Sequence, residues 1–153
     1  MKTKNMLRLL PVLALAVSAV FAKPIAGPKG GKILTTEAPH AEFFVEQDRT
    51  VTVTFYDAAL KPLAPSGQAV TAIAEAKSGK VKLEFAEKNG ALVSKQKMPD
   101  GDDYTVVVQI RDTATAKPTN YRVLFHAETC KECKLAEYAC VCDDAGKEHA
   151  QKK

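Results

Sequence analysis

The four cysteines of the chain lie in one short stretch, "ETCKECKLAEYACVCDD", with the spacing C-x2-C-x6-C-x-C. Cysteine thiolates bind soft cations such as zinc and copper(I). We therefore take Cys130, Cys133, Cys140 and Cys142 as candidate ligands for copper or zinc. His126 is a fifth candidate, because it shortly precedes Cys130 and imidazole nitrogen joins thiolates in many zinc sites.

The same thiols have a second possible state, in which they form disulfides and hold no metal. Cys140 and Cys142, two apart on an extended segment, would have Cα atoms about 6.6 Å apart with nearly parallel side chains, which disfavours a bridge between them. A crossover pairing joins Cys130 and Cys133 to Cys140 and Cys142, and the sequence leaves two connectivities open. A redox role for "CKEC" lacks the βαβ context of thioredoxin-like motifs.

Other groups of reactive side chains carry weaker signals. The chain has no Gly-x-Ser-x-Gly, no His-Glu-x-x-His and no phosphate-binding glycine loop, so we expect a protein that is not an enzyme. The segment "PDGDDY" is predicted to be a hairpin turn rather than a calcium loop. His40 and Glu42 lie two apart in a predicted strand and share one face, which we expect to be exposed to solvent.

The first residues predict export. Lys2, Lys4 and Arg8 precede an apolar run from Leu9 to Phe21, which indicates a signal peptide over residues 1–22 and a periplasmic or secreted protein. Those three cations are among the chain's 22 Lys and Arg, so cleavage leaves 19 against 18 Asp and Glu. The near-neutral balance argues against a nucleic-acid partner, and we expect no membrane span after cleavage.

The rest of the chain supplies the elements that would position the cysteines. Apolar and polar residues alternate in "TVTVTFYD", "GKVKLEFAEK", "YTVVVQIRD" and "NYRVLFHA", and shorter candidates are "KILTT", "AEFFVE", "AVTAIAEA" and "ALVSKQ". The Ala-rich segment could also form a helical turn, but its β-branched residues favour a strand. Alternation of this kind predicts half-buried strands, and segments rich in Gly, Pro, Asn and Asp separate them. Asn89-Gly90 is the strongest hairpin signal.

These patterns predict an all-β protein in three parts. Residues 1–22 are the signal peptide, 23–127 form a Greek-key, immunoglobulin-like β-sandwich of about seven or eight strands, and 128–153 form a cysteine-rich segment and tail. The sandwich is expected to close its own core, so that the cysteines organise an appendage.

Two stretches also carry a family resemblance. "GPKGGKIL" (27–34) and "VTVTFYDAALKPLAP" (51–65) resemble the opening and a later strand-turn stretch in the small periplasmic β-domain of heavy-metal efflux adaptors of the membrane-fusion type. The chain lacks the helical hairpin, lipoyl-like and barrel domains of those adaptors. The resemblance implies a free-standing relative of an accessory domain in metal handling. Alone, Gly30 and Gly31 would indicate only a tight approach before the first strand.

The sequence thus predicts an exported, non-enzymatic accessory protein that binds a soft cation through its cysteine cluster. The alternative is a cell-envelope protein-interaction module whose cysteines form two structural disulfides.

Overall fold

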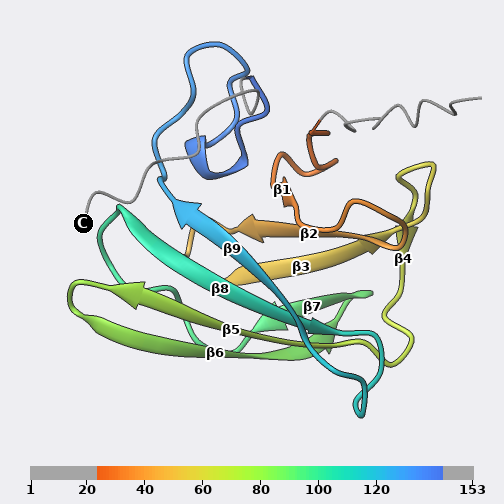
Figure 1. Cartoon of the computed structure of the whole chain (residues 1–153). Helices are drawn as coiled ribbons and strands as arrows, with labels where there is room; N and C mark the ends of the chain where they lie inside the picture. Colours follow the sequence, from red (N-terminus) through yellow and green to blue (C-terminus); the bar gives the residue numbers. More distant parts are fainter. Residues whose placement is uncertain (1–23, 143–153) are drawn as a thin grey trace, which may run out of the picture.

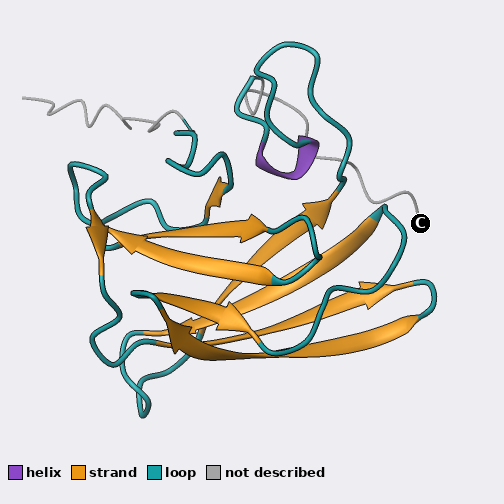
Figure 2. Ribbon diagram, turned by 180° about the vertical axis from the view of Figure 1, so that it is seen from behind, coloured by secondary structure: helices purple, strands orange, loops and turns teal. Residues whose placement is uncertain are grey.

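The computed structural model describes residues 24–142. The predicted signal peptide and the tail from residue 143 lie outside this range. The described residues form nine strands and one 3-10 helix, η1 (Figures 1 and 2). The elements are β1 (Lys32–Ile33), β2 (His40–Val45), β3 (Val51–Tyr56), β4 (Pro62–Leu63), β5 (Ala69–Ala76), β6 (Gly79–Lys88), β7 (Ala91–Ser94), β8 (Tyr104–Arg111), β9 (Thr119–Phe125) and η1 (Glu137–Ala139). No helix among them is long and apolar enough to cross a membrane.

All strands pair antiparallel in one curled sheet. The order is β1-β2-β3-β7-β6-β5-β8-β9, and β4 pairs with β3 beside this path. The long strand β6 joins the two halves of the sheet, because its residues 79–84 pair with β5 and residues 85–88 pair with β7. The sheet therefore turns over on itself, and its two halves lie one above the other (Figure 1).

The strongest sequence patterns are confirmed by the strand bounds. In β8 the residues Tyr104, Val106, Val108 and Ile110 are buried, while the residues between them are only half-buried. The Asn89-Gly90 hairpin forms between β6 and β7, with φ of 53° and 75° at its two central residues. The all-β prediction is thus confirmed, with one more short strand than expected in the turn segment "LKPLAPSG", where β4 lies.

Strand β3 departs from the predicted alternation. Both of its faces are buried, including the threonine face that was expected to be polar and half-exposed. Thr52 and Thr54 are only 4% and 7% exposed. Thr52 keeps its hydroxyl satisfied by donating to Oε1 of Glu46 at 2.7 Å, and β3 pairs with three neighbours rather than lying at an edge.

The core lies between the two halves of the sheet and is almost wholly apolar. It includes Phe43, Leu83, Val106 and Phe125 from the strands, together with Tyr138 from η1. The segment after residue 127 therefore contributes to the core instead of only extending from the last strand.

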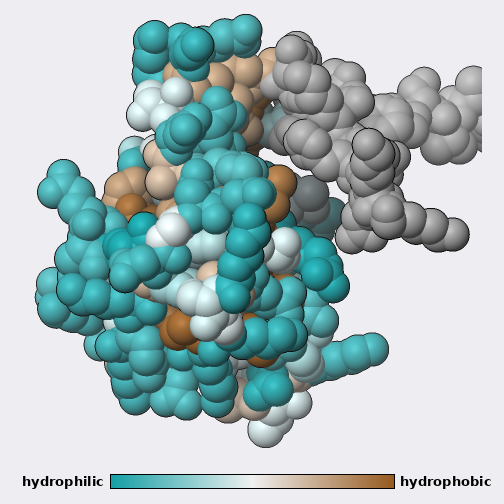
Figure 3. Space-filling view, turned by 90° about the vertical axis from the view of Figure 1, so that its left-hand side faces the viewer, coloured by the Kyte–Doolittle hydropathy of each residue, from teal (hydrophilic) through white to brown (hydrophobic). Residues whose placement is uncertain are grey.

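One face of the molecule shows mostly hydrophilic side chains with small, scattered apolar ones (Figure 3).

Candidate metal centre

The C-x2-C pair lies on a tight turn that closes a short hairpin after β9. A bridge between Thr129 and Ala136 forms the base of this hairpin. Nearer the tip, the backbone amide of Cys130 donates to the carbonyl of Leu135 at 2.7 Å, and the amide of Lys134 donates to the carbonyl of Cys130 at 3.1 Å. Lys134 adopts a φ of 63°, which reverses the chain directly after Cys133. The turn holds both sulfurs of the pair on one side.

Helix η1 returns the chain toward this turn and delivers the C-x-C pair. The amide of Tyr138 donates to the carbonyl of His126 at 3.1 Å, and the amide of Cys140 donates to the carbonyl of Glu137 at 3.1 Å. Tyr138 points into the core, where its ring lies 5.5 Å from that of Phe125. The second cysteine pair is thus positioned by a side chain buried in the sheet.

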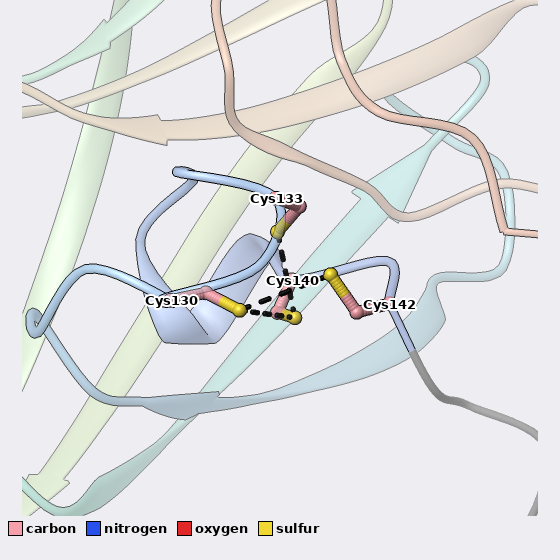
Figure 4. A group of neighbouring side chains, drawn as sticks. All are labelled: Cys130, Cys133, Cys140 and Cys142. Carbon is pink, nitrogen blue, oxygen red and sulfur yellow. Dashed lines mark hydrogen bonds between the residues drawn. The ribbon is translucent and has the colours of Figure 1, made fainter.

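The four sulfurs from these two segments converge (Figure 4). All of them lie within 4.8 Å of one another. Cys130 and Cys140 are separated by 3.3 Å between sulfurs, Cys133 and Cys140 by 3.6 Å, and Cys130 and Cys142 by 3.8 Å. Four thiolates placed tetrahedrally about 2.3 Å from a zinc ion have sulfurs about 3.8 Å apart. The three short spacings lie near this edge length, and the remaining sulfur pairs lie within 4.8 Å of one another.

The same spacings differ from those of a disulfide, whose sulfurs lie about 2.0 Å apart. All four cysteines are free thiols in the structure, and no pair of them lies at bonding distance. The expected crossover arrangement of C-x2-C against C-x-C is present, but it brings sulfurs together without joining them. The geometry is compatible with metal binding.

Backbone amides favour the charged form of one sulfur. The amides of Leu135 and Val141 donate to Cys133, and this lowers the pKa of Cys133 to about 6. Hydrogen bonding to the Cys133 sulfur favours the protonated form of Cys142 and raises the pKa of Cys142. At Cys140 the amide of Cys142 acts to lower the pKa. Burial and the sulfurs of Cys130 and Cys133 outweigh this effect, and the pKa of Cys140 is raised. Cys133 therefore ionises more readily than Cys140 and Cys142.

The site is partly shielded from solvent. Cys130 is only 7% exposed, while the other three cysteines are half-buried. A cavity of about 420 Å³ lies beside Cys140 and Val141 and is lined on its other side mainly by β1 and the residues around it. An ion at the centre of the four sulfurs would therefore be covered on the Cys130 side and approachable from the other.

His126 lies outside the group of four ligand atoms that the cysteines form. Its Nδ1 is 3.8 Å from Oδ2 of Asp102, and its Nε2 is 3.7 Å from Oδ1 of Asp103. Both ring nitrogens therefore face carboxylates of the loop before β8. The cysteines alone complete a four-coordinate site, and the role of His126 as a ligand stays a prediction for which this geometry offers no support.

Of the pair His40 and Glu42, the exposed position expected for Glu42 is wrong. Glu42 is fully buried. The burial is tolerated because the backbone amides of Lys29 and Gly31 and the hydroxyl of Tyr56 donate hydrogen bonds to its carboxylate. Sequence reasoning missed Glu42 and Tyr138 as residues near the site. The signal for Glu42 was present in the glycines of "GPKGG", which indicate a close backbone approach.

Among the described residues the cysteine cluster is the one group of at least three His, Cys, Asp or Glu side chains whose ligand atoms converge. The predicted "PDGDDY" turn forms no such group. No family model, curated protein or solved structure matches the chain significantly. The resemblance to heavy-metal efflux adaptors accordingly stays a prediction. What is established is an all-β chain that gathers four free cysteines at one end of a curled sheet.

Proposed function

We propose that this chain is an exported, non-enzymatic accessory protein of metal handling that binds one soft cation through Cys130, Cys133, Cys140 and Cys142. The observation that carries the proposal is the convergence of four sulfurs within 4.8 Å of one another, three pairs of them at 3.3, 3.6 and 3.8 Å. Four thiolates in this arrangement are typical of zinc. Zinc is therefore the favoured ion, and copper(I) is the other soft cation that thiolates select.

Export to the periplasm or the cell exterior follows from the predicted signal peptide over residues 1–22. An oxidising compartment favours disulfides, so the metal competes there with oxidation. The amide donors to Cys133 support the metal-bound state, because they stabilise a thiolate before any ion arrives. The alternative remains a cell-envelope interaction module in which the four cysteines form two disulfides.

The proposal includes the finer fold assignment, a Greek-key and immunoglobulin-like sandwich. In a Greek key the fourth strand returns to lie beside the first of three hairpin-linked strands. The order β8-β5-β6-β7 follows this scheme and supports the assignment. The core between the two halves of the sheet supports a sandwich architecture.

The decisive experiment counts thiols and metal on the same sample of the mature protein. We expect four titratable thiols after denaturation without reductant, and one equivalent of zinc in the native mass spectrum. No thiols and no metal would overturn the metal proposal and establish the disulfide alternative. Four thiols with no retained zinc or copper would overturn both.

Two variants test the ligand set. Cys142→Ser removes one thiolate and is expected to weaken zinc binding, measured by competition with a chromogenic chelator. His126→Ala is the matched control, because His126 faces Asp102 and Asp103 rather than the sulfurs, and it should retain the wild-type affinity. Loss of zinc in His126→Ala would contradict a site made of sulfurs alone.

A further inference from the structure

Glu42 lies in the middle of β2 and is 0% exposed. Its Oε1 accepts hydrogen bonds from the amides of Lys29 at 2.9 Å and Gly31 at 2.8 Å. Its Oε2 accepts the hydroxyl of Tyr56 at 2.6 Å. A buried carboxylate is costly unless several donors satisfy it. Two of the three donors here belong to one loop, residues 27–31, so the carboxylate fastens that loop to the sheet.

The glycines of this loop permit the close approach. A Cβ on Gly27 would lie 2.1 Å from Oε1 of Glu42, and one on Gly31 would lie 2.4 Å from the carbonyl oxygen of Phe43. Neither position can carry a side chain without displacing the carboxylate or β2. The loop therefore packs directly against Glu42, and this close packing fixes the position of the loop on the sheet.

The same loop lies beside the C-x2-C turn. Gly30, with a φ of 86°, neighbours Leu135, since a Cβ built on it would lie 3.4 Å from Cδ2 of that side chain, an ordinary van der Waals distance. Leu135 in turn belongs to the hydrogen-bonded turn that carries the first cysteine pair. Its carbonyl accepts the amide of Cys130 at 2.7 Å, and the amide of Lys134 donates to the carbonyl of Cys130 at 3.1 Å. A path of neighbouring groups therefore runs from Glu42 through Gly30 and Leu135 to Cys130.

Strand β2 supports the other half of the site as well. The residue after Glu42, Phe43, packs edge-to-face on Tyr138 with ring centroids 6.0 Å apart. The amide of Val45 donates to the Tyr138 hydroxyl at 3.1 Å. The position of β2 relative to the residue 27–31 loop therefore affects both cysteine pairs.

We propose that Glu42 is a positioning residue for the metal site, which holds the residue 27–31 loop against Leu135 and thereby keeps the Cys130 and Cys133 sulfurs at coordinating positions. This inference rests on the proposed metal-binding function. Outer residues that orient metal ligands affect affinity by about 10- to 100-fold when they are replaced. Glu42 acts two contacts away from the sulfur, so a change of about tenfold is expected.

The first test is a double-mutant cycle on zinc affinity. Glu42→Gln can still turn its single carbonyl oxygen to the two loop amides, but it replaces charge-assisted hydrogen bonds by weaker neutral ones. Leu135→Ala removes the side chain beside Gly30 while leaving the carboxylate network intact. Each is expected to raise the zinc dissociation constant about tenfold, and the double variant should lose little more than either single variant. Wild-type affinity in Glu42→Gln, or losses that add, would overturn the inference. Where Glu42→Gln does not fold, unchanged affinity in Leu135→Ala would overturn it.

Tyr56→Phe is the matched control. It removes the third donor to the carboxylate but leaves both loop amides in place. It is expected to lower stability without changing the zinc dissociation constant. An equal loss of affinity in Tyr56→Phe and Glu42→Gln would show a general effect of stability and contradict a positioning role.

A second readout needs no metal. In the reduced, metal-free protein, Glu42→Gln is expected to speed hydrogen exchange at the amides of Lys134 and Leu135 while exchange in β8 stays unchanged. Faster exchange in a chain that binds neither zinc nor copper(I) would overturn the proposed function, while still showing that Glu42 holds the turn of the first cysteine pair in place. If the protein binds zinc and Glu42→Gln changes neither the zinc dissociation constant nor the exchange rates, the positioning role is overturned and the proposed function stands.

Discussion

Tyr138 joins the cysteine segment to the sheet, and its replacement should destabilise the whole protein. The side chain is only 6% exposed, and its ring contacts Phe43 and Phe125 at centroid distances of 6.0 Å and 5.5 Å. Truncation of a buried aromatic side chain to alanine costs about 3–5 kcal/mol. We expect Tyr138→Ala to lower the free energy of unfolding by that amount.

Tyr138→Phe separates the hydroxyl from the ring. It keeps the aromatic contacts but leaves the amide of Val45 without its acceptor. A hydrogen bond lost in this way costs about 1–2 kcal/mol, including the desolvated partner. Tyr138→Phe should therefore show roughly a third of the loss in Tyr138→Ala.

The assay is equilibrium unfolding in urea, followed by circular dichroism in the presence of reductant and chelator, so that neither disulfides nor metal contribute. Tyr121→Phe is the control, because the Tyr121 hydroxyl makes no hydrogen bond among the described residues, and a change within about 0.5 kcal/mol is expected. A loss below about 1 kcal/mol in Tyr138→Ala, with an unchanged m-value, would refute the docking of the cysteine segment into the core.

Three further predictions concern metal, backbone space and pH. Zinc present at about a hundred times its dissociation constant should raise the free energy of unfolding by about 2.7 kcal/mol, and equal thermal midpoints with zinc and with chelator would contradict a bound metal. Gly31→Ala should cost about 3 kcal/mol, because the carbonyl of Phe43 blocks its Cβ. Gly90→Ala, with open space around it and a φ of 75°, should cost only the strain of that positive φ, about 1 kcal/mol; equal losses in urea unfolding would count against the close approach. Burial raises the pKa of all four tyrosines above 10.0, with Glu42 adding to the effect at Tyr56. Because the native state holds these protons more tightly, their stabilising contribution is complete below pH 10.0 and is lost as the pH rises beyond it. Tyrosinate absorbance should therefore appear together with unfolding as the pH rises. Ionisation of the tyrosines near pH 10.0 in a folded chain would disprove the raised pKa values.

The strands were predictable because their information is local. Alternation set the bounds of β6, β-branched residues favoured a strand at β5, and Asn89-Gly90 fixed the hairpin that follows β6. Sequence spacing also brought the four cysteines together, since a tight C-x2-C turn and a nearby C-x-C pair need only a short connection to meet.

The supporting residues were not predictable, because their partners are distant in sequence. Tyr138 bonds to Val45, 93 positions away. The burial of Glu42 depends on a loop 11 to 13 positions before it and on Tyr56 in the next strand. Both faces of β3 are buried because of three pairing neighbours, which no alternation of residues within the strand reveals.

The position of the cysteine segment after β9 also sets an order of events during synthesis. Every strand among residues 24–142 precedes Cys130 in the chain, so all of them emerge before the first thiol, whether from the ribosome or from an export channel. No disulfide can then form while only the strands have emerged. Because Tyr138 and Ala139 belong to the core, completion of the core also brings the two cysteine pairs together.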